Sequence, residues 1–78
     1  MKYFSIAIHS FAEVQAFVSL AMVQPFEVLV GNENHRINGK SFIGMFSLDF
    51  RYPQQVQVNC DDIAFARFRQ EAARFLVT

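Results

Sequence analysis

Hydrophobic and polar residues follow two repeating patterns along the chain, and these patterns divide it into segments. Residues 2–8 are rich in β-forming side chains and partly alternate, which predicts a strand. Apolar side chains then recur three and four positions apart over residues 11–22, which predicts an amphipathic helix. Pro25 ends this helix, because the residue before a proline is pushed away from helical backbone geometry.

The middle of the chain combines short extended segments with turns. Residues 26–30 predict a strand by β-propensity, and residues 31–34 are rich in residue types that favour turns. A short return strand is expected at residues 35–37. With Ser41 as the N-cap, residues 42–48 are expected to form a short helix with an apolar face.

The last third of the chain repeats the change from strand to helix. Residues 54–60 alternate from Gln55 on, which predicts a strand with one buried side. Asp61 or Asp62 caps a final helix, whose helical spacing is carried by Phe65, Phe68, Ala72 and Phe75. This order predicts an α/β (α+β) open-faced two-layer sandwich, in which three helices cover one face of a four-stranded, mainly antiparallel sheet.

The composition sets the size and the class of the protein. A chain of 78 residues, 53% of them hydrophobic and ten of them Phe, is expected to be a single domain, residues 1–78, with a dense core. The formal net charge is zero, which argues against a nucleic-acid partner because such proteins carry a basic excess. Low charge and many aromatic side chains also favour self-association, for example as a homodimer.

Candidate cofactor and membrane features are few. Cys60 is the only cysteine, so there is no intrachain disulfide and no cysteine cluster for a metal. The two histidines are too few to argue a metal site, and no cofactor is implied. No apolar run suits a signal peptide or a membrane span, so a cytoplasmic protein without membrane contact is expected.

The segment INGKSFIGMFSLDF, residues 37–50, resembles HPr, the histidine-containing phosphocarrier of the bacterial sugar phosphotransferase system. Many HPr proteins read close to V-N-L-K-S-I-M-G-V-M-S-L in this region. The residues of this chain that match in place are Asn38, Lys40, Ser41, Gly44, Ser47 and Leu48. The order of elements corresponds over nearly the whole chain, so the resemblance implies an HPr-like sandwich.

The family's phosphoryl-accepting histidine lies in the pattern H-x-R-P-A-A-x-F-V at the start of the first helix. Aligning residues 16–18 on the end of this pattern places Ser10 at the position of the histidine. Ala12 then stands where the family has arginine, and Glu13 where it has proline. The preceding loop is also about four residues shorter than usual in the family. This chain therefore resembles a divergent member that lacks the active-site motif.

His9 is one position away from the expected histidine, and two interpretations of it stay open. In one, His9 accepts a phosphoryl group at a helix start, where free N–H groups bind anions. In the other, His9 is a solvated loop residue. Ser10 and Glu13 match a capping box, in which the Ser10 hydroxyl accepts from the Glu13 N–H and the Glu13 carboxylate accepts from the Ser10 N–H.

Ser41 also has two interpretations. The resemblance implies a regulatory serine that HPr kinase phosphorylates with ATP, after which the phosphoserine form binds a transcription regulator. A phosphate at a helix N-terminus is compatible with the helix dipole. The alternative is an ordinary N-cap. The neighbouring residues expected to contact a partner are Lys40, Phe42, Ile43 and Met45.

These observations predict a non-catalytic HPr-like protein that regulates by binding other proteins and is controlled by phosphorylation at Ser41. The alternative is an active phosphocarrier, which accepts a phosphoryl group on His9 from the phosphoenolpyruvate-dependent general enzyme of the phosphotransferase system. A third alternative is a self-associating structural module. Expected partners are phosphotransferase-system enzymes, HPr kinase or a transcription regulator. An enzyme with turnover of its own is not expected, since the resemblance implies a phosphoryl carrier at most.

Overall fold

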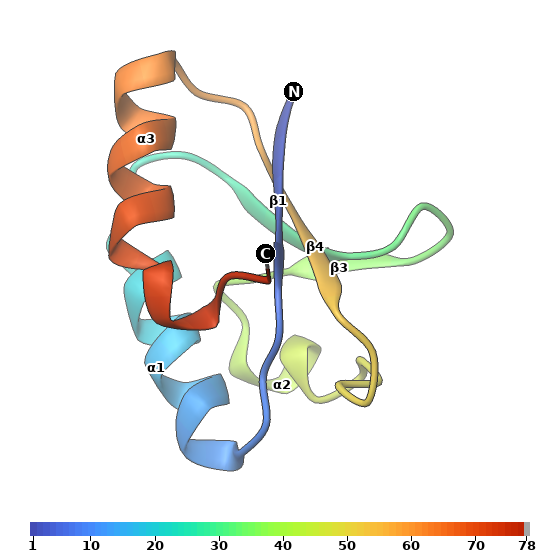
Figure 1. Ribbon diagram of the computed structural model, residues 1–78. Helices are drawn as coiled ribbons and strands as arrows, with labels where there is room; N and C mark the ends of the chain where they lie inside the picture. The colour runs from blue at the N-terminus through green and yellow to red at the C-terminus, as the bar shows by residue number, and fades with distance from the viewer. Residues whose placement is uncertain (78) are drawn as a thin grey trace.

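The computed structural model describes residues 1–77 and contains one sheet and three helices (Figure 1). The strands are β1 (Lys2–Ile6), β2 (Val28–Gly31), β3 (Arg36–Asn38) and β4 (Gln54–Val58). The helices are α1 (Phe11–Met22), α2 (Phe42–Met45) and α3 (Asp62–Glu71), and a 3-10 turn, Ala73–Phe75, follows α3.

The four strands lie in the order β1-β4-β2-β3, and all neighbouring pairs are antiparallel. Val56 on β4 is paired with Phe4 on one side and with Val30 on the other. Because side chains alternate between the two faces of a strand, these three residues share one face, and all three are buried. The predicted open sheet with helices on one face is confirmed.

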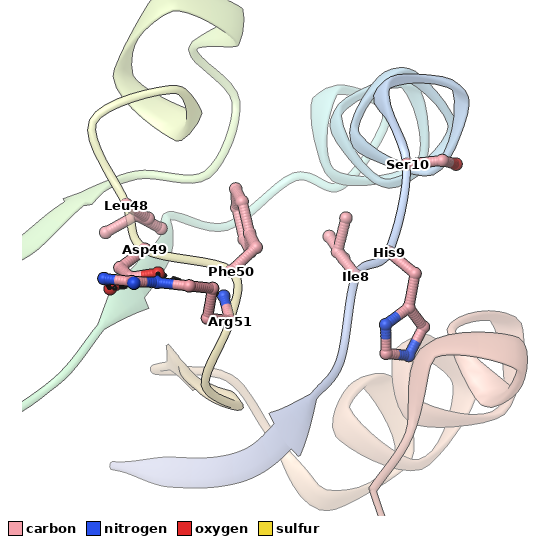
Figure 2. A pocket seen from close by; sticks show the side chains of 7 residues that line it. All are labelled: Ile8, His9, Ser10, Leu48, Asp49, Phe50 and Arg51. Carbon is pink, nitrogen blue, oxygen red and sulfur yellow. Dashed lines mark hydrogen bonds and ion pairs between the residues drawn. The ribbon is translucent and has the colours of Figure 1, made fainter.

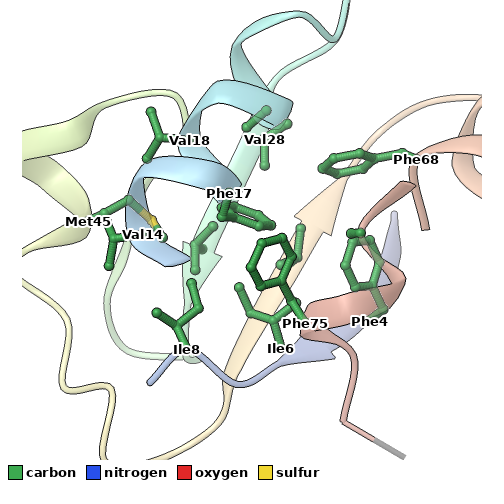
Figure 3. Packing of buried hydrophobic residues seen from close by; sticks show 14 of the residues in the cluster. Phe4, Ile6, Ile8, Val14, Phe17, Val18, Val28, Met45, Phe68 and Phe75 are labelled. Atoms are coloured by element: carbon green, nitrogen blue, oxygen red, sulfur yellow. The ribbon is translucent and has the colours of Figure 1, made fainter. Parts of the chain in front are cut away.

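The core lies between this sheet face and the helices (Figure 3). Phe17 of α1 and Phe68 of α3 are fully buried, and Phe68 meets Phe4 of β1 edge-on at 5.5 Å between ring centroids. Met45 of α2 is also fully buried. Each side chain of this size stabilises the fold by roughly 1.5–3 kcal/mol when it leaves water. The core thus joins all three helices to the sheet.

The strands are shorter than the sequence pattern predicts. β1 ends at Ile6, two residues before the expected limit, although Ile8 is still buried. β2 begins at Val28 instead of residue 26, and β4 ends at Val58 instead of residue 60. Apolar side chains next to these strands pack into the core from a backbone that has left the sheet, so the hydrophobic pattern overestimates strand length.

Two helical segments also end earlier than expected. α2 ends at Met45 and not at residue 48, because the N–H groups of Phe46 and Ser47 bond to carbonyls only three residues back. This tighter winding stops the α-helix. The final helix ends at Glu71, and the 3-10 turn that follows still places Phe75 in the core.

The C-terminal segment extends the sheet in a way that the sequence pattern does not show. The N–H of Ala7 donates to the carbonyl of Phe75 at 2.8 Å, and the N–H of Val77 donates to the carbonyl of Ser5 at 3.0 Å. Part of the free edge of β1 is therefore paired, which protects it from other strands.

Candidate functional site

The loop before α1 positions His9 and Ser10, and both residues are exposed. The Ser10 hydroxyl accepts a hydrogen bond from the Glu13 N–H at 3.2 Å, as the capping box predicts. The expected second half of the box is wrong, because the Glu13 carboxylate accepts from the N–H of His9, at 2.6 Å, and not from that of Ser10. The backbone is extended at Ser10, where successive N–H groups point in opposite directions.

His9 lies at the edge of a hollow of about 440 Å³ between this loop and the segment that follows α2 (Figure 2). The residues lining it are Ile8, His9, Ser10, Leu48, Asp49, Phe50 and Arg51. In Figure 2 the imidazole extends toward the ribbon of the C-terminal helix, and Asp49 and Arg51 lie on the other side of Ile8. The fold therefore brings an arginine to the same hollow as His9 but does not direct the two side chains toward each other.

Arg51 is held by Asp49 in a bidentate ion pair. The Arg51 Nε donates to Asp49 Oδ1 at 2.9 Å, and its Nη2 donates to Oδ2 at 2.8 Å. The hydrogen bonds from the Arg51 side chain, and then from its backbone N–H, lower the pKa of Asp49, while Asp49 raises the pKa of Arg51. A phosphoryl group in this hollow would have to compete with a carboxylate for the guanidinium.

The charges around His9 do not favour an anion. The Glu13 carboxylate already occupies the backbone N–H of His9, and it brings a negative charge to the first turn of α1. This charge would repel a phosphoryl group that approaches the start of α1, because like charges repel. Exposure makes the imidazole accessible to a partner, whereas the arginine that lines the same hollow is held by Asp49.

Ser41 and Lys40 precede α2, and both make contacts within the chain. The Ser41 hydroxyl accepts from the N–H of Gly44 at 3.1 Å, so Ser41 is the N-cap. The Lys40 Nζ donates to the carbonyl of Gln24 at 2.7 Å, just beyond the end of α1. Lys40, expected to contact a partner, is thus engaged with the end of another helix.

Three phenylalanine rings gather on the surface where α1 begins beside α2. Phe11 lies 5.6 Å from Phe42 and 5.5 Å from Phe46 between ring centroids, and Phe42 lies 5.1 Å from Phe46. Phe11 is 57% exposed and Phe46 is 49% exposed, and neighbouring Ile43 reaches 84%. We call the four residues Phe11, Phe42, Ile43 and Phe46 the aromatic patch.

The structure changes the set of residues expected to contact a partner. Met45 is fully buried, so its side chain belongs to the core and no partner can reach it without unfolding α2. Phe11 and Phe46 take its place at the surface. Sequence reasoning assigned both of them to helix faces, because Phe11 extends the apolar stripe of α1 and Phe46 follows Phe42 by one turn. The signal for their exposure is tertiary, since it depends on how α2 lies against α1.

Among residues 1–77 no three side chains of His, Cys, Asp or Glu are placed to hold a metal ion together. Within the same residues no helix is both long and apolar enough to cross a membrane.

Comparison with known proteins identifies the fold. No protein-family model matches the chain, and no curated protein matches it in sequence. The chain is similar in structure to HPr-C-His from Thermoanaerobacter tengcongensis, whose crystal structure aligns with a TM-score of 0.70 and 24% sequence identity. The alignment covers 90% of this chain and 89% of that chain. With its strand order and its three helices on one sheet face, the chain has the HPr-like fold.

Proposed function

We propose that this chain is a non-catalytic HPr-like protein related to the phosphotransferase system, and that it acts by binding other proteins through the aromatic patch. The observation that carries this proposal is the exposure of the patch beside Ser41. Ile43 is 84% exposed, next to two half-exposed rings that stack at 5.5 Å. Exposed aromatic clusters in a small protein are typical of sites where a partner binds.

The surroundings of His9 support a role without phosphotransfer. Glu13 accepts from the backbone N–H of His9 and places a negative charge in the first turn of α1, and Asp49 holds the arginine that lines the same hollow. Binding of a phosphoryl group at a helix start depends on free N–H groups and on a free cation. The chain keeps the scaffold of a phosphocarrier, while the arginine near His9 is held by a carboxylate and Glu13 adds a negative charge at the helix start.

Ser41 supplies the proposed control of binding. It lies directly before Phe42 and Ile43 in the chain, so a phosphoryl group on its oxygen would bring a charge of about −2 to the margin of the aromatic patch. The Gly44 N–H, which now donates to Ser41 Oγ at 3.1 Å, would remain close enough to donate to the phosphate. Phosphorylation would thus change which partner the patch accepts.

The second candidate is an active phosphocarrier on His9, favoured by one observation. His9 is exposed and lines the same hollow as Arg51. If the Asp49–Arg51 pair opens when a partner binds, the guanidinium would be free to hold a phosphoryl group on His9. This carrier would receive the phosphoryl group from the phosphoenolpyruvate-dependent general enzyme.

A binding experiment with a matched control tests the leading proposal. The ¹⁵N-labelled protein is titrated with the general phosphotransferase enzyme and, separately, with HPr kinase without ATP. We expect signals of the aromatic patch to broaden with at least one of them, and Ile43→Ser to abolish this effect. Ile63→Ser is the control, because Ile63 is also an exposed helical isoleucine, 74% exposed, but lies on α3. Broadening that survives Ile43→Ser, or none with either protein, would contradict the proposal.

A further inference from the structure

In Figure 1, α1 and α3 lie on one side of the sheet, and the residues of the opposite face range from the exposed Tyr3 to the buried Gln57. Strand pairing places the residues of this opposite face in two rows across the four strands. The first row is Tyr3, Gln57, Leu29 and Asn38, and the second is Ser5, Gln55, Gly31 and Arg36. We call these residues the open sheet face. It lies on the side of the sheet away from the aromatic patch.

Arg36 is the only charged residue in these rows, and its hydrogen bonds are poorly satisfied. Its Nε is buried with no hydrogen-bond partner, and its Nη2 reaches Gln55 Oε1 only at 3.5 Å. Gly31, which has no side chain, stands between Arg36 and Gln55 in the row. Among residues 1–77 no carboxylate forms an ion pair with Arg36. A partly buried cation without a counter-charge is costly for the free protein.

The neighbours of Arg36 offer further hydrogen-bond donors. The side-chain carbonyl oxygen of Gln55 accepts from Arg36, so the amide nitrogen of Gln55 can donate to a ligand. The exposed hydroxyl of Ser5 is next in the same row. Guanidinium, amide and hydroxyl together match the two oxygens of a carboxylate. Beside them, the 45% exposed ring of Tyr3 and the half-buried Leu29 supply apolar surface.

We infer that the open sheet face binds an extended acidic segment of a partner protein. A carboxylate of this segment pairs with Arg36, Gln55 and Ser5, and an apolar side chain of the same segment lies against Tyr3 and Leu29. The charge and the hydrogen-bond donors of the second row carry the inference. It does not depend on the aromatic patch or on phosphorylation, so it adds a second binding surface to the protein.

Two other occupants fit the face less well. A second copy of the chain bound symmetrically would present the same residues, and the described strands contain no Asp or Glu to meet Arg36. A nucleic acid needs several cations along its backbone, whereas these rows hold one and the chain has no net charge. An acidic peptide segment is the occupant whose charge and hydrogen bonds match.

The test uses two peptides that differ only in charge. The ¹⁵N-labelled protein is titrated with acetyl-Leu-Glu-Leu-Glu-amide and with the matched Gln peptide, and shifts are followed for backbone amides and for the Arg36 Nε–H. We expect saturable shifts at Ser5, Gln55 and Arg36 with the Glu peptide, and about tenfold weaker binding of the Gln peptide, since hydrogen bonds to charged groups are the stronger ones. Added salt should weaken the first titration only.

Substitutions show which residues of the protein bind the Glu peptide. Arg36→Gln should reduce binding of the Glu peptide to that of the Gln peptide, and Arg36→Lys should bind with intermediate strength. Phe46→Ser should leave both titrations unchanged, which separates this inference from the proposed function. Four results would each overturn the inference. They are equal shifts with both peptides, shifts centred outside the open sheet face, equal shifts with inorganic phosphate, and shifts that follow protein concentration alone. The two-peptide comparison on the unmodified protein decides the question even if an Arg36 variant fails to fold.

Discussion

At the scale of single residues, two serines have the same local geometry but different surroundings. Ser10 and Ser41 are both N-caps and accept from the N–H three residues ahead, at 3.2 and 3.1 Å. Ser10 is exposed beside the carboxylate of Glu13, whereas Ser41 is half-buried and directly precedes the aromatic patch. We therefore expect an added negative charge to be disfavoured at Ser10 and tolerated at Ser41.

A pair of substitutions at Ser41 tests this difference. Ser41→Ala should lower the free energy of unfolding by about 1 kcal/mol, because the Gly44 N–H loses its acceptor. Ser41→Asp should retain most of the stability, since aspartate is a good N-cap and its charge suits a helix start. Urea denaturation followed by circular dichroism measures both values. An Asp variant as unstable as the Ala variant would show that this position does not accept a negative charge.

Cys60 gives a second prediction at this scale. Burial raises the pKa of its half-buried thiol, Lys2 acts in the opposite direction, and Asp61 and Asp62 add to the rise. A raised pKa means that the folded state favours the neutral thiol over the thiolate. The stability that the neutral Cys60 thiol contributes is therefore lost as pH rises from the thiol pKa of the unfolded chain toward that of the folded protein. At pH 8, iodoacetamide should therefore alkylate Cys60 more slowly in the folded protein than in urea. Equal rates, measured by intact mass, would show an open and reactive thiol.

At the scale of elements, α2 shows both what the sequence predicts and where prediction stops. The position of α2, its cap at Ser41 and its apolar character follow from residues close in the chain. Which side chains it buries does not, because a four-residue helix is oriented by its contacts with α1 and the sheet. Met45 is turned into the core while Ile43 is 84% exposed, although both were expected to meet a partner.

The same distinction holds for the rest of the fold and for the site. The strand and helix order follows from local hydrophobic periodicity and caps, so it was predictable. Three features join residues far apart in sequence: Val77 pairs with β1, Phe11 stacks with Phe46, and Arg51 lines the same hollow as His9. No local pattern encodes such contacts, because they depend on how the elements pack together.

Two alanine substitutions in α2 measure the asymmetry of this helix. Met45→Ala should destabilise the protein by about 2–5 kcal/mol, since it leaves a cavity in a core where Met45 is fully buried. Ile43→Ala should change the free energy of unfolding by less than about 0.5 kcal/mol, because the side chain is mostly in water. Thermal or urea unfolding of the two variants makes the comparison. Similar losses from both would mean that α2 lies in another orientation against the core.

At the scale of the whole molecule, the fold separates two surfaces by one core. The aromatic patch lies in the helical layer, and the open sheet face lies on the other side of the sheet, with Phe17 and Phe68 packed between sheet and helices. A chain of 78 residues has a total stability of only about 4–12 kcal/mol. Both surfaces therefore depend on the same small core, and partners on either side would stabilise it by binding the folded state.

The central claim is that this HPr-like chain works by binding proteins and not by transferring a phosphoryl group on His9. The most direct test is the intact mass after incubation with the general phosphotransferase enzyme and phosphoenolpyruvate, with an HPr protein that carries the usual histidine as the positive control. The account predicts no acid-labile phosphoryl adduct on this chain when the control is fully modified. An acid-labile adduct that disappears in His9→Ala would contradict it and identify the protein as an active phosphocarrier.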